Sequence, residues 1–168
     1  MSSLAELLAQ LNGRNEDQAE VASAELARLG QAALPALLVL LKSSDVDQRW
    51  WAVRTLARLA TPQPTALLEA LTDPVPEIRE AAALALAVHP TDEPIPALVR
   101  ALEDEDNMVP GLAAKALAAI GRSAVPSLIE AFESASPRGR IHMMRALAEL
   151  CDHRAIPLMM RADRKSVV

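Results

Sequence analysis

Aromatic residues are almost missing from this chain of 168 residues, which holds no tyrosine, one phenylalanine and two tryptophans. Its core must therefore be filled by smaller side chains, and 51% of the residues are hydrophobic, mostly alanine and leucine. Such a composition excludes a disordered chain and is typical of helices packed at close range.

Other absences narrow the function. The single cysteine, Cys151, excludes an internal disulfide and fits a reducing compartment. The net charge of −5 argues against binding to a phosphate backbone. No apolar run approaches the roughly 18 residues of a membrane span, and the N-terminus lacks the cationic start of a signal peptide. We therefore expect a cytoplasmic protein that binds neither nucleic acid nor a membrane.

What the chain does contain is an internal repeat of about 30 residues. One column of leucines recurs at this spacing, and each leucine is followed by alanine: Leu26, Leu56, Leu86, Leu117 and Leu147. A second column opens short apolar segments: Pro35, Thr65, Pro96, Pro126 and Pro157. Each repeat thus predicts two antiparallel helices, for example residues 77–88 and 96–103, with proline in the first turn of the second helix.

The predicted fold is all-α, a right-handed solenoid of about eleven helices in which stacked repeats share one core. Residues 3–12 match a second helix alone, so they form an N-terminal half-repeat. Five full repeats follow, at about 15–43, 44–72, 73–103, 104–134 and 135–165. We expect a single domain over residues 1–168.

The repeats resemble HEAT repeats, most closely the short bacterial subclass named after phycobilisome lyase subunits. The third repeat carries nearly the whole pattern, with Asp73, Ile78, Arg79, Ala82, Ala83, Ala85 and Leu86. The first repeat departs from it at Ala19, and the fourth at Pro110 and Gly111. Because proline fits only a first helical turn, we expect that helix to begin late, after a longer loop over residues 104–109, and to alter the local stacking angle.

The two tryptophans, Trp50 and Trp51, are adjacent within one predicted helix. Successive helical residues lie about 100° apart, so the rings cannot both point into one core. We expect each ring to cover a seam with a neighbouring repeat, with Trp51 more buried and Arg54 within reach of either ring. Packing is the reading we favour, and Trp50 is also a candidate binding residue.

In the HEAT family the second helices line the concave face. The column farthest from their buried residues is Val39, Glu69, Arg100, Glu130 and Arg161. A mixed-charge strip of this kind suits a protein or peptide partner, so we take this column as the partner-binding surface. The alternative is that these residues are only solvent-exposed positions on the helices and bind no partner.

Candidate chemistry is sparse. His142, Cys151 and His153 lack the spacing of a zinc site, and the acidic residues 103–107 lack the offsets of a calcium loop. We expect no metal, no cofactor and no catalytic residue. The pattern residues Arg49, Arg79 and Arg140 are expected to be structural, with Asp73 and Arg79 paired between repeats.

Three functions compete. We expect a non-enzymatic scaffold or adaptor that binds a protein on the concave face. The alternative, which the subclass resemblance implies, is a bilin lyase or chaperone subunit of the phycobilisome-lyase type, working with a second subunit. A HEAT-like DNA glycosylase fits poorly, because it requires a cationic concave surface.

The last predicted helix has a polar end but is followed by two valines. Either Arg161, Asp163 and Arg164 make it a polar cap, or the chain continues, or another chain covers the apolar residues Met159, Met160, Val167 and Val168. We favour coverage or continuation, since terminal repeats need a polar outer face. Self-association through the C-terminal repeat is one form of such coverage.

Overall fold

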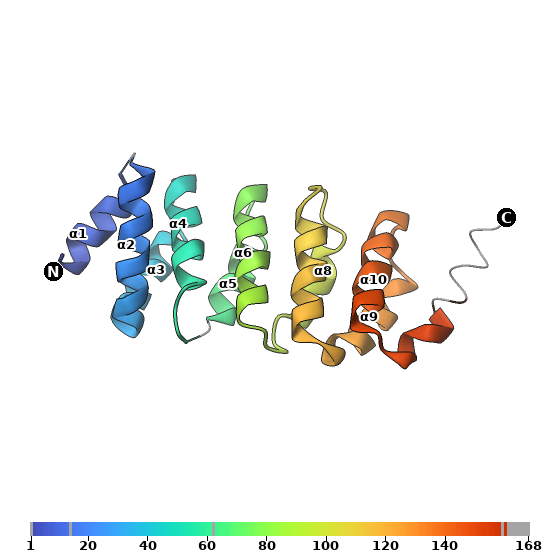
Figure 1. Ribbon diagram of the computed structural model, residues 1–168. Helices are drawn as coiled ribbons and strands as arrows, with labels where there is room; N and C mark the ends of the chain where they lie inside the picture. The colour runs from blue at the N-terminus through green and yellow to red at the C-terminus, as the bar shows by residue number, and fades with distance from the viewer. Residues whose placement is uncertain (1, 14, 62, 159, 161–168) are drawn as a thin grey trace. The chain divides into compact units, whose positions relative to one another are not determined.

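The computed structural model describes residues 2–13, 15–61, 63–158 and 160. Over these residues the chain is helical and contains no strand, which confirms the all-α prediction (Figure 1). The chain divides into two compact units, residues 1–89 and 90–168. The single domain over residues 1–168 and its repeat boundaries stay predictions.

In the first unit a lone helix, α1 (Leu4–Leu11), packs against α2 (Glu16–Leu29), as expected of a half-repeat. Longer first helices then alternate with shorter second helices. They are α3 (Leu34–Leu40), α4 (Val46–Leu56), α5 (Pro64–Ala70) and α6 (Pro76–Val88), with a 3-10 turn at Gly30–Ala32.

The second unit has the same alternation. It contains α7 (Ile95–Ala101), α8 (Val109–Ile120), α9 (Val125–Phe132) and α10 (Pro137–Leu150), with 3-10 turns at Arg122–Ala124 and His153–Ala155. Residues 156–158 and 160 are also helical, as expected for the start of the last helix. The polar end of that helix, Arg161 included, lies outside the described residues.

Local sequence explains where the helices begin. Ser3 and Glu6 form a capping box at α1: the Glu6 amide donates to Ser3 Oγ (3.2 Å), and the Ser3 amide donates to Glu6 Oε2 (2.7 Å). The Asp45 carboxylate caps α4 in a similar way. Proline occupies the first turn of α3, α5, α7 and α9, where its missing N–H costs nothing.

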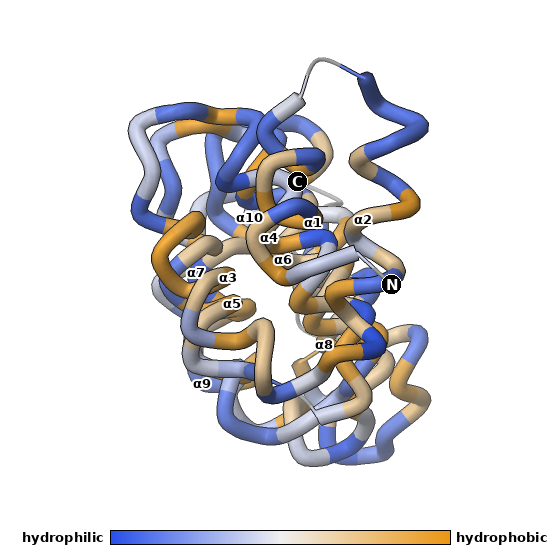
Figure 2. The backbone as a smooth tube through the Cα atoms, turned by 90° about the vertical axis from the view of Figure 1, so that its left-hand side faces the viewer, coloured by the Kyte–Doolittle hydropathy of each residue, from blue (hydrophilic) through white to orange (hydrophobic). Residues whose placement is uncertain are grey.

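The repeating leucine column forms the core of each unit. Its five members, Leu26, Leu56, Leu86, Leu117 and Leu147, are at most 2% exposed. The short second helices are also strongly hydrophobic, α3 most evidently (Figure 2). The 30-residue spacing therefore identified the buried positions.

Helix α8 begins late, as Pro110 predicts. It starts eight residues before its core leucine, Leu117, whereas α4, α6 and α10 start ten residues before theirs. Residues 104–108 form the preceding loop. The altered stacking angle stays a prediction.

The pattern arginines are structural, as expected, and a pattern arginine does pair with a pattern aspartate between repeats, although Asp73 pairs with Arg49 and not with Arg79. Each guanidinium donates to backbone carbonyls of the turn before its own helix: Arg49 to Ser43 and Ser44, Arg79 to Asp73 and Pro74, and Arg140 to Phe132 and Glu133. The Asp73 carboxylate is held by Arg49 of the preceding repeat, so the predicted pairing with Arg79 is wrong. Arg79 is engaged by the Asp73 carbonyl instead, because its helix begins immediately after that turn.

Within the described residues, no single helix has both the length and the apolar character to cross a membrane. Two strongly bent helix pairs, 16–40 and 109–132, would pass on length and composition alone.

Candidate protein-binding surfaces

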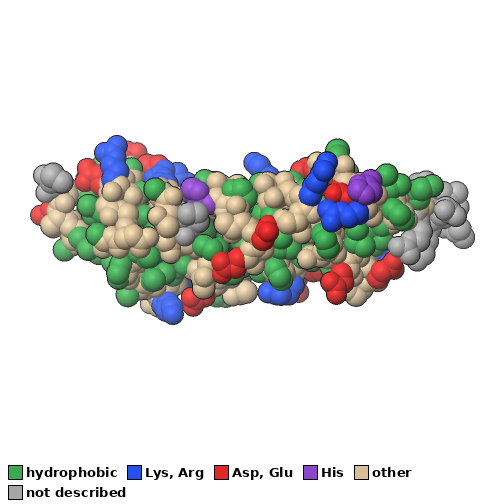
Figure 3. Space-filling model, turned by 90° about the horizontal axis from the view of Figure 1, so that it is seen from below, with side chains coloured by type: hydrophobic (Ala, Val, Ile, Leu, Met, Phe, Trp, Pro, Cys, Tyr) green, Lys and Arg blue, Asp and Glu red, His purple; other side chains and the backbone are tan. Residues whose placement is uncertain are grey.

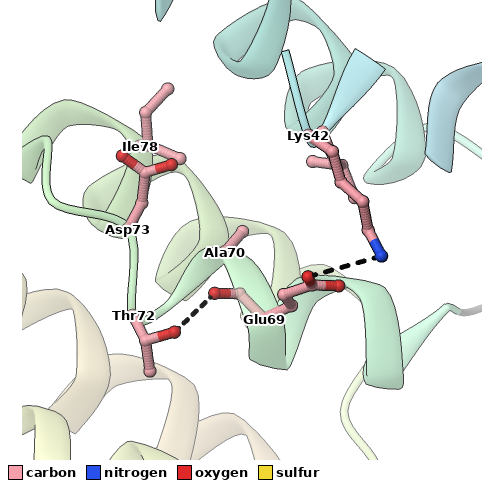
Figure 4. Close-up of a pocket in the computed structure, with 7 residues that line it drawn as sticks. Lys42, Glu69, Ala70, Thr72, Asp73 and Ile78 are labelled. Carbon is pink, nitrogen blue, oxygen red and sulfur yellow. Dashed lines mark hydrogen bonds and ion pairs between the residues drawn. The ribbon is translucent and has the colours of Figure 1, made fainter. Parts of the chain in front are cut away.

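In the first unit the predicted column lies on the surface of the second helices. Val39 of α3 is 71% exposed, and Glu69 of α5 is exposed as well. Lys42 Nζ lies 3.7 Å from Glu69 Oε1, and the two side chains point toward one another (Figure 4). An ion pair this exposed contributes about 0–1 kcal/mol, so both charges remain accessible to a partner.

In the second unit Arg100 of α7 and Glu130 of α9 are exposed, and their helices pack side by side. Arg161 lies outside the described residues. Charges of both signs are interspersed on the face seen in Figure 3. The described members of the column are therefore surface residues, and their role in binding stays a prediction.

A hollow of about 230 Å³ lies beside Glu69, where α3 and α5 end and α6 begins (Figure 4). Its lining residues are Leu41, Lys42, Glu69, Ala70, Thr72, Asp73 and Ile78. The Thr72 hydroxyl donates to the Glu69 carbonyl (2.8 Å). Sequence reasoning missed this hollow, because it is made by helix ends and turns that no single column describes. It is smaller than the roughly 300–1,000 Å³ of sites that enclose drug-sized ligands.

The Asp73 carboxylate at this hollow is fixed by two hydrogen bonds from Arg49, Nε to Oδ2 at 2.7 Å and Nη2 to Oδ1 at 3.1 Å. Both side chains are buried, 11% exposed for Arg49 and 9% for Asp73. Burial acts to raise the pKa of Asp73, but the hydrogen bonds from Arg49 and the Val75 amide outweigh it and hold the pKa below its ordinary value. Asp73 is thus an anchored anion that joins two repeats.

The relative burial of the tryptophans and the reach of Arg54 are as predicted, and the covering of two seams stays a prediction. Trp51 is 8% exposed and Trp50 is half-buried, with ring centroids 4.9 Å apart in an edge-to-face arrangement. The Arg54 guanidinium lies 5.1 Å from the Trp50 ring and 5.9 Å from the Trp51 ring. Arg58 and Arg54 both bind Glu20 of α2, and these hydrogen bonds lower the pKa of Glu20. A role for Trp50 in binding stays a prediction.

Of the residues considered for a metal site, the Cys151 thiol donates to the Ala148 carbonyl (3.1 Å), and His142 is half-buried. His153 is 88% exposed in its side chain and lies 3.8 Å from buried Asp152, whose carboxylate accepts hydrogen bonds from Arg154. Hydrogen bonds from Arg154 hold the pKa of Asp152 far below its ordinary value. No group of three metal-ligating side chains occurs among the residues that the structure describes.

The acidic turn at residues 103–107 joins two repeats. Glu103 accepts from the Ser136 amide (3.0 Å) and hydroxyl, and Arg138 donates to backbone carbonyls of the turn. Gly139 makes this contact possible, because a Cβ there would lie 2.0 Å from Glu103 Oε1. The sequence offered one signal for it, a glycine within a predicted helix.

Comparison with known proteins identifies the family of the chain and proteins similar to it. The sequence profile of HEAT repeats matches residues 4–87, 64–140 and 95–167. The bilin biosynthesis protein RpcF of Synechococcus sp. (strain WH8020) is 35% identical, over 61% of this chain and 54% of that protein. The phycocyanobilin lyase subunit beta of Nostoc sp. (strain PCC 7120) is 37% identical, over 48% of this chain and 41% of that protein. The chain spans about half the length of the curated relatives it matches.

Among solved structures, the complex of CpcE and CpcF of phycocyanin lyase from Nostoc sp. PCC7120 is similar, with a TM-score of 0.64 and 25% identity. The match covers 85% of this chain and 96% of that chain. This likeness confirms the predicted α-α superhelix as the fold class.

These findings overturn two predictions. The expected non-enzymatic scaffold or adaptor is wrong, and so is the expectation that the chain is not an enzyme, because its relatives are named for bilin biosynthesis and as a lyase subunit. The physical reason is that the repeat pattern depends on residues that pack in the core, and these residues do not reveal which chemistry the surface supports.

Proposed function

Because the chain belongs to the HEAT-repeat family, and because its relatives in that fold are bilin lyase subunits, we propose that it is a subunit of a phycobilisome-type bilin lyase. The observation that carries this proposal is the likeness to RpcF and to the phycocyanobilin lyase subunit beta. The similar solved structure is a complex of two subunits, which supports a second protein subunit as partner. The predicted cytoplasmic location belongs to the same proposal.

The geometry suggests how such a subunit holds a bilin. A bilin is a linear chain of four pyrrole rings, and the hollow of about 230 Å³ beside Glu69 is too small to enclose it. Within the proposal, the bilin is held between this chain and another protein surface rather than in this hollow. The anchored Arg49–Asp73 pair and the arginine contacts to turn carbonyls keep the second helices fixed, so the chain presents a preorganised surface to the partner.

Within this proposal the column on the second helices is one contact surface for the acceptor protein or the partner subunit. Val39, Glu69, Arg100 and Glu130 are exposed, so reversing charges there leaves the core intact. We expect a variant with Glu69→Lys, Arg100→Glu and Glu130→Lys to lose partner binding with its thermal unfolding almost unchanged. A lower unfolding temperature would mean that the column is structural.

Reconstituted bilin transfer tests the function. The chain is mixed with phycocyanobilin, apo-phycocyanin and either CpcE or CpcF of Nostoc, and covalent bilin is measured by absorbance after denaturing gel filtration. We expect attachment well above that given by the same Nostoc subunit alone. Attachment no higher than this background, with CpcE plus CpcF active in parallel, would contradict the proposal.

A further inference from the structure

One flank of α2, of α4 and of α8 receives the first helix of the next repeat, which is α4, α6 and α10 respectively. On α2 this flank is Glu20, Ser23 and Ala27. Glu20 binds Arg54 of α4, and Ser23 accepts a hydrogen bond from Thr55 of α4 (2.9 Å). The 30-residue register gives the equivalent flanks on the other helices: Trp50, Val53 and Ala57 on α4; Gly111, Ala114 and Ala118 on α8; Ile141, Met144 and Ala148 on α10.

On α10 this flank is left uncovered by the described residues. The middle residue is fully buried on the covered helices, with 0% exposure for Ser23 and Val53 and 2% for Ala114, whereas Met144 is only half-buried. Ala27, Ala57 and Ala118 are half-buried, whereas Ala148 is exposed. Ile141 is 69% exposed, although Trp50 and Gly111 are half-buried. All three flank positions of α10 are thus more exposed than their equivalents.

The open flank is also apolar along the whole helix. Pro137, Ile141, Met144, Ala148 and Cys151 follow one another at spacings of four and three residues, which place them on one face. At 1.5 Å per residue the 14-residue helix carries this stripe over about 21 Å. A stripe of this length and pattern fits a second helix laid against it.

The other repeats define the chemistry of the covering helix. The covering helix carries a small buried residue opposite the middle position of the flank. Thr55 of α4 and Ala146 of α10 hold this place in the covered seams, and both are 0% exposed. Where the flank bears Glu20, it is bound by Arg54 of α4 and by Arg58 of the turn after α4.

Where the flank bears Trp50, the register places aliphatic Leu84 and Val88 of α6 opposite the ring. Helices α4 and α6 pack against each other. By analogy with Trp50, we expect aliphatic side chains at these two positions of the helix that covers Ile141.

We propose that this open flank, Ile141, Met144 and Ala148, is the docking site for an amphipathic HEAT-type helix of a second protein subunit. The contact continues the helix-on-helix seam that already joins α8 to α10 (Figure 1). The inference rests on the proposed function, which supplies the partner, and it locates the subunit contact at α10. The predicted coverage of Met159 and the terminal valines concerns residues outside the described part of the chain and stays a prediction, as it does for Met160, which is 57% exposed.

The test compares Ile141→Lys with a matched control, Val88→Lys, an aliphatic residue of α6 that is 60% exposed. Ala148→Glu provides a second charge in the seam. Each variant is checked by thermal unfolding, and its Kd for CpcE and for CpcF of Nostoc is measured by calorimetry. Light scattering across concentration follows self-association.

We expect the wild-type chain to bind one Nostoc subunit, with hydrogen-exchange protection appearing in residues 137–151. Ile141→Lys and Ala148→Glu should each weaken that binding at least about tenfold, as for a central interface residue, and Val88→Lys should not. Normal binding and bilin transfer by Ile141→Lys would overturn the docking site and leave the lyase function standing. Binding of neither subunit would overturn both. Self-association that Ile141→Lys abolishes would show that a second copy is the occupant, and would overturn the choice of partner.

Discussion

Replacement of Asp73 by asparagine tests how neighbouring repeats are joined. Asp73 receives two hydrogen bonds from Arg49, 2.7 and 3.1 Å long, and one from the Val75 amide at 2.9 Å. The Asp73→Asn substitution keeps the volume and removes the charge. It leaves a buried guanidinium without its counter-ion in the seam between two repeats.

The expected cost follows from this geometry. Removing one partner of a buried ion pair costs about 3–5 kcal/mol. Arg49 keeps its bonds to the Ser43 and Ser44 carbonyls, at 2.9 and 3.3 Å, and asparagine still offers one acceptor. We therefore expect a loss of about 2–3 kcal/mol in the free energy of unfolding. In a chain of this size that lowers the unfolding temperature by about 5–10 °C.

Urea unfolding followed by circular dichroism measures the cost, and a cycle with Arg49→Met isolates the pair. We expect the double variant to lose about 2 kcal/mol less than the two single losses combined. Glu69→Gln is the matched control, because it breaks an exposed pair with Lys42 and should cost under about 0.5 kcal/mol. Equal losses in Asp73→Asn and Glu69→Gln, or strictly additive losses at Arg49 and Asp73, would refute the reasoning.

The same pair sets a pH dependence. The pKa of Asp73 in the folded chain lies below the ordinary value of 3.8. Its stabilisation is therefore complete above pH 3.8 and is lost as the pH falls from there through the folded pKa. The stability difference between wild type and Asp73→Asn should shrink over that acidic range. A difference that stays constant down to the folded pKa would contradict the assignment.

Two further substitutions test the second unit. Gly139→Ala should lower the free energy of unfolding by about 1 kcal/mol although alanine favours helices, because its Cβ displaces Glu103 from Ser136. Thermal unfolding measures this loss, and in a Glu103→Ala background the same substitution should stabilise the chain. Cys151→Gly should raise the free energy of unfolding by about 0.5–1 kcal/mol in urea, because Cys151 has a φ of 48°, a left-handed conformation that favours glycine. A loss of stability instead would show that the thiol contact with the Ala148 carbonyl outweighs the backbone strain.

The sequence predicted the parts of the fold that depend on columns. The 30-residue periodicity identified the buried leucines, the prolines of the second helices and the late start of α8 at Pro110. Each is set by the residue type at one fixed position of the repeat. Comparison of equivalent positions between repeats also predicted that Trp51 is more buried than Trp50. It could not find the partner of Asp73, since Arg49 and Arg79 stand in equivalent positions of successive repeats. Only the rise between repeats decides which of the two reaches the carboxylate.

The candidate surfaces could be predicted only in part, because exposure in a stacked fold depends on the neighbouring repeat as well as on the residue. Ile141 shares its column with Glu20, Trp50 and Gly111, and that column is half-buried wherever a next helix follows. An isoleucine in the column is unremarkable when covered, but at α10 it is 69% exposed. The residues across the covered seams change together: arginines face Glu20, and aliphatic residues are placed opposite Trp50. By analogy with the Trp50 seam, the exposed Ile141 favours a covering helix with apolar side chains at those positions.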